Sequence, residues 1–178
     1  TQELADEIYS VRLTGKNIVA HIEDLGASAA YWAASQATRI TANQTAEIGS
    51  IGTVAVLTDD SARLERLGVK VHVISTGQYK GAGTQGASLS SDDLSYIRSR
   101  VESLNNHFQA AILKGRGMSG KQLALMSDGR VHIAKDAMTL KFIDAIMSFE
   151  QALEEANNLK IQEKNTTGAV LQESHSAL

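Results

Sequence analysis

The sequence predicts an α/β fold, because segments with the pattern of short buried strands alternate along the chain with segments of helical periodicity. No internal repeat is visible, and the order of these segments requires crossover connections between strands. Of the 178 residues, 43% are hydrophobic and 21% are charged, as in ordinary globular proteins. We therefore expect one domain whose core is large enough to fold without disulfides or metal ions.

Local patterns in the first half of the chain predict three helices and several strands. Leu4, Ile8 and Val11 recur at helical spacing before a glycine, which predicts an amphipathic helix. The nearly continuous apolar run 51–58 is typical of a strand covered on both faces. The expected elements are a helix at 1–14, a strand at 18–22, a helix of small residues at 27–38, strands at 39–42, 51–58 and 69–74, and a short helix capped by Asp59 and Asp60 that ends at Gly68.

The second half begins with a glycine-rich loop, residues 75–87, whose one cation is Lys80. Ser90 and Asp93 then form a capping box, and the apolar period that follows predicts the longest helix, ending near Gly115. The remaining expected elements are a helix from about 119, a turn at Asp128 and Gly129, a strand at 131–133, a helix at 135–140, a strand at 142–146 and a helix at 148–157. The polar residues 159–178 are expected to form a disordered tail or linker.

Composition argues against several functional classes. There are 17 Lys and Arg against 20 Asp and Glu, a net charge of −3, so no basic field favours nucleic acid or an anionic membrane. The absence of cysteine leaves no thiolate nucleophile, disulfide or cysteine metal site. The longest uncharged stretch, 25–38, is shorter than the roughly 20 apolar residues of a membrane span, and the acidic N-terminus does not resemble a signal peptide.

Three polar residues are candidates for chemistry. Ser28 follows an apolar strand and begins a helix of small residues, where backbone N–H groups and the helix dipole favour an oxyanion. Lys80 lies among glycines and uncharged residues, and a lysine removed from water can act as a neutral general base. Ser50 directly precedes the apolar run. Each has an ordinary alternative: a helix cap for Ser28, a solvated loop residue for Lys80 and a turn residue for Ser50.

Four segments together resemble the signal peptide peptidase A (protease IV) family of serine peptidases, which includes phage and prophage capsid proteases. The segments are residues 26–32, 42–52, 79–80 and 128–131, and their order and spacing are similar to the family's. The similarity covers about residues 1–150. It implies a Clp protease/crotonase-like fold, a spiral of strand-strand-helix units, and peptide-bond hydrolysis through a Ser-Lys dyad and an acyl-enzyme.

Carried onto this sequence, the resemblance implies that Ser28 is the nucleophile and Lys80 the general base. Ser50 would orient the lysine amine, and the Ala29 N–H would be one oxyanion donor. The alanines at 29 and 30 stand where the family usually has a glycine pair, a change associated with capsid-processing members.

The resemblance also implies a peptide or protein substrate and a homo-oligomer in which neighbouring subunits enclose the sites. No cofactor is expected; the lack of cysteine and the spacing of the histidines argue against a metal, and the charge balance argues against nucleic acid. Residues 1–158 would form a peptidase domain that lacks the family's N-terminal strand and its second oxyanion donor. A bacterial or phage source is implied, in the cytoplasm or at a membrane through segments outside this chain.

Other interpretations fit parts of the sequence. A phage or prophage capsid maturation protease is one, and a non-catalytic shell or scaffold component with the same fold is another. The glycine loop lacks the strand and helix context of a phosphate-binding P-loop. A histidine hydrolase or a zinc site would have to draw on residues that lack metal-type spacing, namely His21, His72, His107, His132 and His175.

Overall fold

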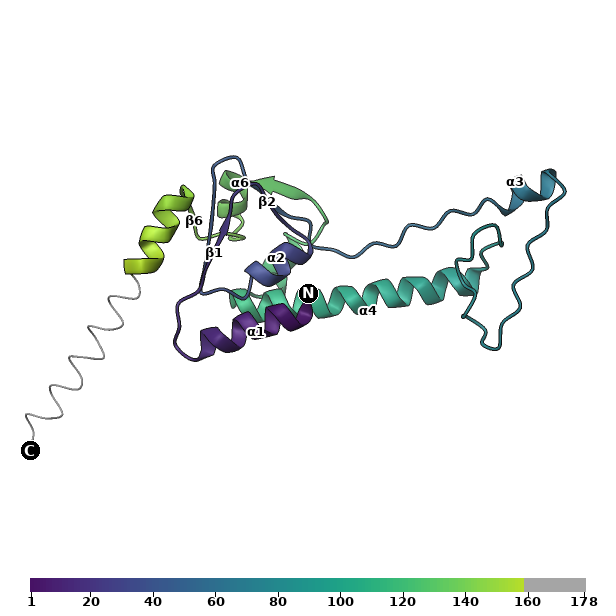
Figure 1. Ribbon diagram of the computed structural model, residues 1–178, viewed down its shortest axis with the longest axis horizontal. Coiled ribbons are helices and arrows are strands. Elements are labelled where there is room, and N and C mark those ends of the chain that lie inside the picture. The colour runs from purple at the N-terminus through teal and green to yellow at the C-terminus, as the bar shows by residue number, and fades with distance from the viewer. Residues whose placement is uncertain (159–178) are drawn as a thin grey trace, which may run out of the picture. The chain divides into compact units, whose positions relative to one another are not determined.

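The described chain consists of two compact units. The computed structural model describes residues 1–158, and the predicted tail, 159–178, lies outside that range. Unit 1 comprises Thr1–Gly52 and the described residues from Phe108 onward, and unit 2 is Thr53–His107. Figure 1 shows the elements in chain order. Unit 1 therefore contains both ends of the described chain, and unit 2 is inserted between its two parts.

Two small sheets form the centre of unit 1. The first has the order β1-β3-β6 and is parallel throughout, with strands at Val19–Ile22, Arg39–Ala42 and Ala145–Ile146. The second has the order β2-β4-β5, with strands at Leu25–Ala27, Glu47–Gly49 and Val131–Ile133. In it β2 and β4 are parallel, and β5 is antiparallel to β4. Helices and strands alternate as predicted, and the mixed α/β class is confirmed.

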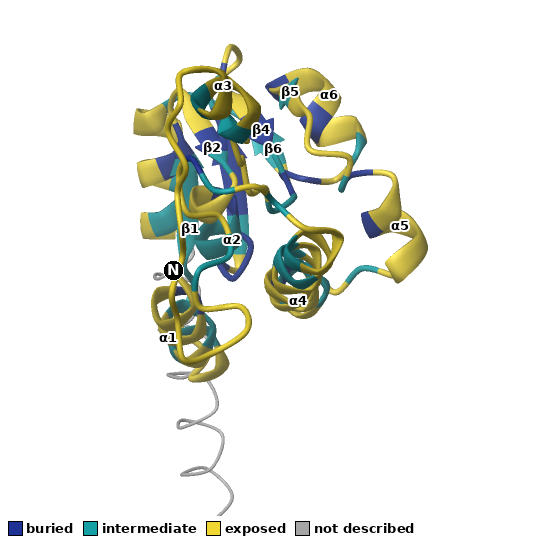
Figure 2. Cartoon of the chain, turned by 90° about the vertical axis from the view of Figure 1, so that its right-hand side faces the viewer, coloured by how far each residue is buried: buried dark blue, intermediate teal, exposed yellow. Residues whose placement is uncertain are grey.

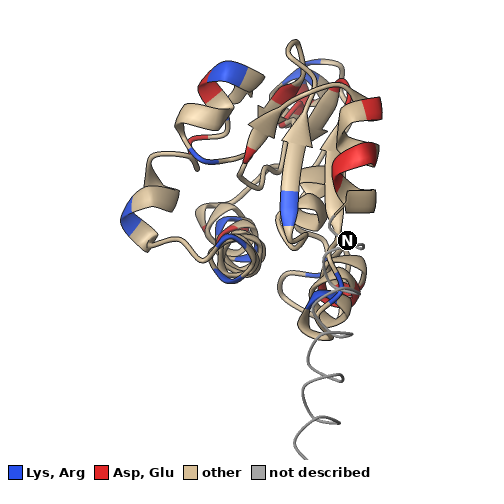
Figure 3. Ribbon diagram, turned by 90° about the vertical axis from the view of Figure 1, so that its left-hand side faces the viewer, with Lys and Arg blue, Asp and Glu red and all other residues tan. Residues whose placement is uncertain are grey.

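Helices cover these sheets. Those of unit 1 are α1 (Gln2–Leu13), α2 (Ala29–Ala34), the end of α4 (Ser91–Arg116), α5 (Gly120–Ala124), α6 (Ala134–Thr139) and a helix at residues 149–158. Ser119 and Gln122 form a capping box at the start of α5, as its sequence favours. The last helix is acidic, and its Glu155 forms an ion pair with Arg39 at the start of β3; the charged residues are coloured in Figure 3.

The core of unit 1 lies between α2, the strands and the end of α4. Figure 2 shows the buried residues concentrated on the strands and on the inner sides of the helices. Tyr31 of α2 is fully buried, and its hydroxyl donates to the Phe142 carbonyl over 2.9 Å. Burial raises the pKa of this phenol well above its ordinary value. Trp32 stacks on Phe108 with ring centroids 5.0 Å apart.

Two close contacts join the helices of unit 1. Gly115 of α4 lets α2 approach, because a Cβ at this position would lie only 2.2 Å from the Ser35 carbonyl oxygen. Arg12 of α1 donates through Nη1 to the carbonyl oxygens of Ala37 and Gly115, over 3.2 and 2.7 Å. As a result α1 lies along the C-terminal part of α4, as Figure 1 also shows.

Unit 2 contains α3 (Ser61–Arg66), the predicted glycine-rich loop and the first part of α4. Asp60 is the N-cap residue of α3, but its side chain makes no cap hydrogen bond. Asp59, one residue earlier, accepts hydrogen bonds from the backbone and side chain of Ser61. Ser90 and Asp93 form the predicted capping box of α4. No helix among residues 1–158 is both long enough and apolar enough to cross a membrane.

Two predicted strands, one spanning the start of unit 2 and one within it, are wrong. Residues 51–58 and 69–74 have no strand pairing, and Val54, Val56 and Ile74 are 81%, 86% and 96% exposed. An apolar run indicates that a segment can be buried, but it holds no information about which segment would cover it.

Two further boundaries differ in unit 1. The predicted helix 27–38 is shorter, because Ala27 pairs with Gly49 as part of β2 and the helix begins at Ala29. The predicted strand 142–146 is reduced to Ala145–Ile146, since the Phe142 N–H closes the end of α6 by donating to the Ala137 carbonyl. Pairing with distant residues overrides local propensity at both places.

Candidate active site

Ser28 occupies the sharp turn between β2 and α2. Its backbone has φ 52° and ψ −121°, a conformation that residues other than glycine rarely adopt. The Ser28 N–H donates to the Gly49 carbonyl and its own carbonyl accepts from the Trp32 N–H, both over 2.9 Å. The residue is exposed. A strained serine on a strand-to-helix turn is the arrangement that presents a nucleophilic Oγ to solvent.

The Ser28 hydroxyl does not cap α2. No helix N–H donates to its Oγ, and among residues 1–158 the hydroxyl has no hydrogen-bond partner. The helix-cap explanation of this serine therefore fails. The neighbouring Ala29 N–H is the first of α2, a position at which backbone N–H groups have no acceptor within the helix.

The strand register brings Ser50 close to Ser28. Because β2 and β4 are parallel and Ala27 pairs with Gly49, the two serines leave neighbouring strands at the same edge of the sheet. Ser50 also has a positive φ, 49°, and its N–H donates to the Arg130 carbonyl over 2.7 Å. Gly49 permits this approach, since its φ is 132° and a Cβ there would lie 2.6 Å from that carbonyl oxygen.

The turn before β5 positions the Arg130 carbonyl, which accepts from the Ser50 N–H. Asp128 accepts from the Arg130 N–H over 3.0 Å and from its Nε over 2.7 Å, and Gly129 has φ 84°. The hydrogen bonds from Arg130 lower the pKa of the Asp128 carboxyl below its ordinary value. The segment 128–131 is thus linked through the backbone to Ser50, and through Gly49 to Ser28.

Lys80 lies in unit 2, in the turns of the glycine-rich loop. Its N–H donates to the Gly77 carbonyl over 3.1 Å, and its side chain is exposed. The adjacent Tyr79 stacks on Tyr96 of α4 with ring centroids 4.6 Å apart. The structure therefore brings Ser28, Ala29 and Ser50 together in unit 1, and the role of Lys80 stays a prediction. A lysine that acts as a neutral base has to be removed from water. Within unit 2, however, the Lys80 side chain is exposed to solvent.

No group of three His, Asp or Glu side chains within residues 1–158 is arranged to hold a metal ion. The site chemistry available in unit 1 consists of an exposed hydroxyl, a second hydroxyl nearby and the N–H groups at the start of α2. Those groups are suited to attack on a carbonyl carbon and to stabilisation of the oxyanion that results.

Residues 11–163 match the family model described as peptidase family S49. The chain belongs to peptidase family S49. Membership confirms the family predicted from the four segments, and the S49 match includes both candidate serines and Lys80.

Relatives of this S49 chain carry the names of proteases. Protease 4 of Haemophilus influenzae is 26% identical over 164 residues, which are 92% of this chain and 26% of that protein. Capsid assembly protease C of Escherichia phage lambda is 28% identical over 151 residues, 85% of this chain and 34% of that protein. The chloroplastic serine protease SPPA of Arabidopsis thaliana is 26% identical over 139 residues, 78% of this chain and 20% of that protein. The chain spans about half or less of the length of the relatives that it matches.

Sequence reasoning did not assign a role to Gly49 or Arg130 in this S49 site. Both belong to segments that carry the family resemblance, and a glycine directly before a candidate serine was a usable signal of unusual backbone geometry. The contact between Gly49 and the Arg130 carbonyl depends on the pairing of β4 with β5, which local patterns do not specify.

Proposed function

We propose that this chain is the peptidase domain of a serine endopeptidase that cleaves extended segments of peptides or proteins. The observation that carries the proposal is the strained, exposed Ser28 with its unpartnered hydroxyl. Membership of a peptidase family and the protease names of the relatives support it. The proposed domain is residues 1–158, with the Clp protease/crotonase-like spiral as its fold.

In the proposed mechanism, Ser28 Oγ bonds to the carbonyl carbon of the scissile peptide while the neutral Lys80 amine takes its proton. The Ala29 N–H donates to the oxyanion, and the Ser50 hydroxyl orients the lysine amine. The carbon–nitrogen bond then breaks, and Lys80 returns the proton to the leaving amine. Water repeats these steps on the acyl-enzyme, which releases the carboxylic acid and restores Ser28.

The substrate follows from the family rather than from a groove in unit 1. We propose a peptide or protein segment with small or apolar side chains, in a homo-oligomer whose neighbouring subunits enclose the sites. Because Lys80 is exposed, the atoms that remove this side chain from water in the proposed mechanism have to come from outside unit 2.

A fluorophosphonate probe tests the nucleophile directly, since it reacts with activated serine hydroxyls. We expect labelling of the protein and of the control Ser10→Ala, whose serine lies exposed on α1, and no labelling of Ser28→Ala. Equal labelling of the protein and of Ser28→Ala would reject Ser28 as the nucleophile. Labelling of neither would favour a scaffold component without catalysis.

The general base is tested by the rate of the same reaction. We expect Lys80→Ala to slow labelling by about 10²–10⁴-fold, the usual contribution of a positioned base. Lys70→Ala, which removes another exposed lysine of unit 2, should leave the rate unchanged. If both lysine variants react at the rate of the unmodified protein, Lys80 has no part in the mechanism.

A further inference from the structure

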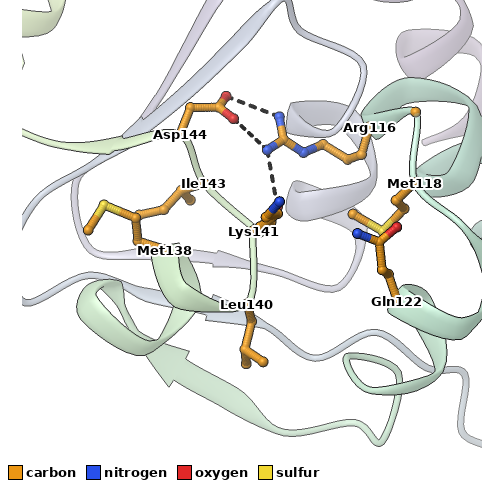
Figure 4. Close-up of a pocket in the computed structure, with 9 residues that line it drawn as sticks. Arg116, Met118, Gln122, Met138, Leu140, Lys141, Ile143 and Asp144 are labelled. Carbon is orange, nitrogen blue, oxygen red and sulfur yellow. Dashed lines mark hydrogen bonds and ion pairs between the residues drawn. The ribbon is translucent and has the colours of Figure 1, made fainter.

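A cavity of about 450 Å³ lies in unit 1 between the end of α4, α5 and the segment after α6. None of its lining residues belongs to the candidate active site. Figure 4 shows Met118 and Gln122 on one side, Met138 and Ile143 on the other, and Lys141 between them. The volume is in the range of sites for small molecules or for one or two residues of a peptide.

The backbone of Lys141 is unusual at this cavity. Its φ is 65°, and it occupies the position after the end of α6 where glycine is the common residue. The Lys141 N–H donates to the Met138 carbonyl over 3.0 Å, and the next N–H, of Phe142, donates to the Ala137 carbonyl over 2.9 Å. These two bonds are those of a Schellman motif, whose left-handed position is usually occupied by glycine and is unfavourable for a lysine.

A lysine in this strained position therefore points to a function of its side chain. Seven glycines within residues 1–158 have a positive φ, but only three other residues do, namely Ser28, Ser50 and Lys141. Two of these three are the serines of the candidate active site. Strained residues other than glycine gather at functional positions, and Lys141 is the one that the proposed mechanism does not use.

The charges around the cavity leave the Lys141 ammonium free. Arg116 donates to the two carboxylate oxygens of Asp144 over 3.0 and 2.6 Å, and also to the Lys141 carbonyl over 3.1 Å. Arg116 and Asp144 therefore neutralise each other, and Arg116 holds the backbone that carries Lys141. Within residues 1–158 the Lys141 side chain has no ion-pair partner, so the cavity carries one uncompensated positive charge.

A second donor is also available. Gln122 uses its Oε1 to accept from the backbone and the hydroxyl of Ser119, over 2.9 and 3.0 Å. Its Nε2 has no acceptor among the described residues. Lys141 and Gln122 thus each offer the cavity a side-chain donor without an acceptor among the described residues. The apolar residues of the lining are Met118, Met138, Leu140 and Ile143.

We propose that this cavity binds a monocarboxylate with an apolar body, and specifically the free C-terminus of a peptide that ends in an apolar residue. One positive charge matches one carboxylate. A phosphate dianion would leave one of its two negative charges unmatched, because Arg116 is already paired with Asp144. Methionine side chains adapt to apolar groups of different shape, which suits varied terminal residues.

The site does not depend on the proposed catalysis, and its test uses Ser28→Ala protein so that no peptide is cleaved. Calorimetric titration compares acetyl-Ala-Leu as the free acid, the same peptide as its C-terminal amide, and octanoate. We expect the free acid to bind at least about tenfold more tightly than the amide, as for loss of a charge-assisted contact. Equal binding of acid and amide, or no binding of either, would overturn the proposal. Binding of octanoate without the peptide would overturn the choice of a peptide C-terminus.

Variants of Lys141 separate binding from folding. Lys141→Gly should weaken binding of the free acid by about tenfold or more, while the melting temperature stays equal or rises because the strained φ is relieved. Lys141→Arg should retain binding, and Lys121→Gln, a lysine of α5 outside the cavity lining, should leave it unchanged. Unaltered binding in Lys141→Gly, or a fall in its melting temperature, contradicts the assignment.

Discussion

Replacement of Ser28 by glycine should stabilise the protein while removing its candidate nucleophile. The φ of 52° costs about 1–3 kcal/mol for a residue with a Cβ, and glycine relieves this strain. Glycine also gives the unfolded chain more freedom, which offsets roughly 0.4–1 kcal/mol of the gain. The net effect is a stabilisation of about 1 kcal/mol. Ser28→Ala keeps the Cβ and loses no capping bond, so its stability should stay close to that of the unmodified protein.

Urea unfolding followed by tryptophan fluorescence measures this difference. Trp32 is the single tryptophan, and it packs against Phe108 in unit 1, so its signal reports the unit that contains Ser28. With a slope of about 1–3 kcal/mol per molar urea, the midpoint of Ser28→Gly should lie roughly 0.3–1 M above that of Ser28→Ala.

A matched control makes the sign of the effect informative. Ser10 lies within α1, where the same serine-to-glycine change should destabilise the protein by about 0.5–1 kcal/mol. If Ser28→Gly unfolds at the same urea concentration as Ser28→Ala, or at a lower one, the backbone at Ser28 is not strained and the reasoning fails.

Two further predictions concern packing and pH. Gly115→Ala should lower the free energy of unfolding by about 1–3 kcal/mol in the same urea assay, because the new Cβ would lie 2.2 Å from the Ser35 carbonyl oxygen. This cost exceeds the gain from the higher helix propensity of alanine. An equally stable variant would show that α2 and α4 can separate without cost. For Asp144, burial raises the carboxyl pKa, but hydrogen bonds from Arg116 and from the Ile40 N–H, with the nearby charges of Arg116 and Arg39, lower it overall. Since the folded pKa is depressed, this stabilisation is present above the unfolded value of about 3.9 and is lost as the pH falls through the folded value. Asp144→Asn should therefore be less stable than the unmodified protein at pH 7, and the difference in unfolding free energy should shrink in acid. A difference that does not change with pH would mean that the ion pair does not contribute.

Features that depend on neighbouring residues in the sequence were predictable. The helix at Gln2–Leu13, the strand at Val19–Ile22 and the capping box of Ser90 with Asp93 all appear where local patterns place them. The runs 51–58 and 69–74 were misassigned because both are apolar enough for a buried strand, yet no strand among residues 1–158 pairs with either of them. Covering an apolar segment requires a partner, and the identity of that partner is not a local property.

In the candidate site, too, local features were predictable and features set by distant residues were not. Residue type and spacing pointed to Ser28 and Ser50, but the positive φ of each serine arises from pairing with distant segments. The Arg130 carbonyl reaches Ser50 only because β5 pairs with β4. Lys141 carried no sequence signal that separates it from a solvated lysine, since its distinction is a backbone angle at the end of α6.

The hydrogen bond from Ser50 to Arg130 also has a consequence for a chain that is still being made. Residues of unit 2 and most of α4 are synthesised between these two partners, and a ribosome adds roughly 5–20 residues per second. Ser28 is therefore synthesised about 5–20 s, and Ser50 about 4–16 s, before Arg130 exists to complete their sheet. During that interval β5 is absent, so the Ser50 N–H lacks its acceptor and the β2-β4-β5 sheet beside both serines is incomplete.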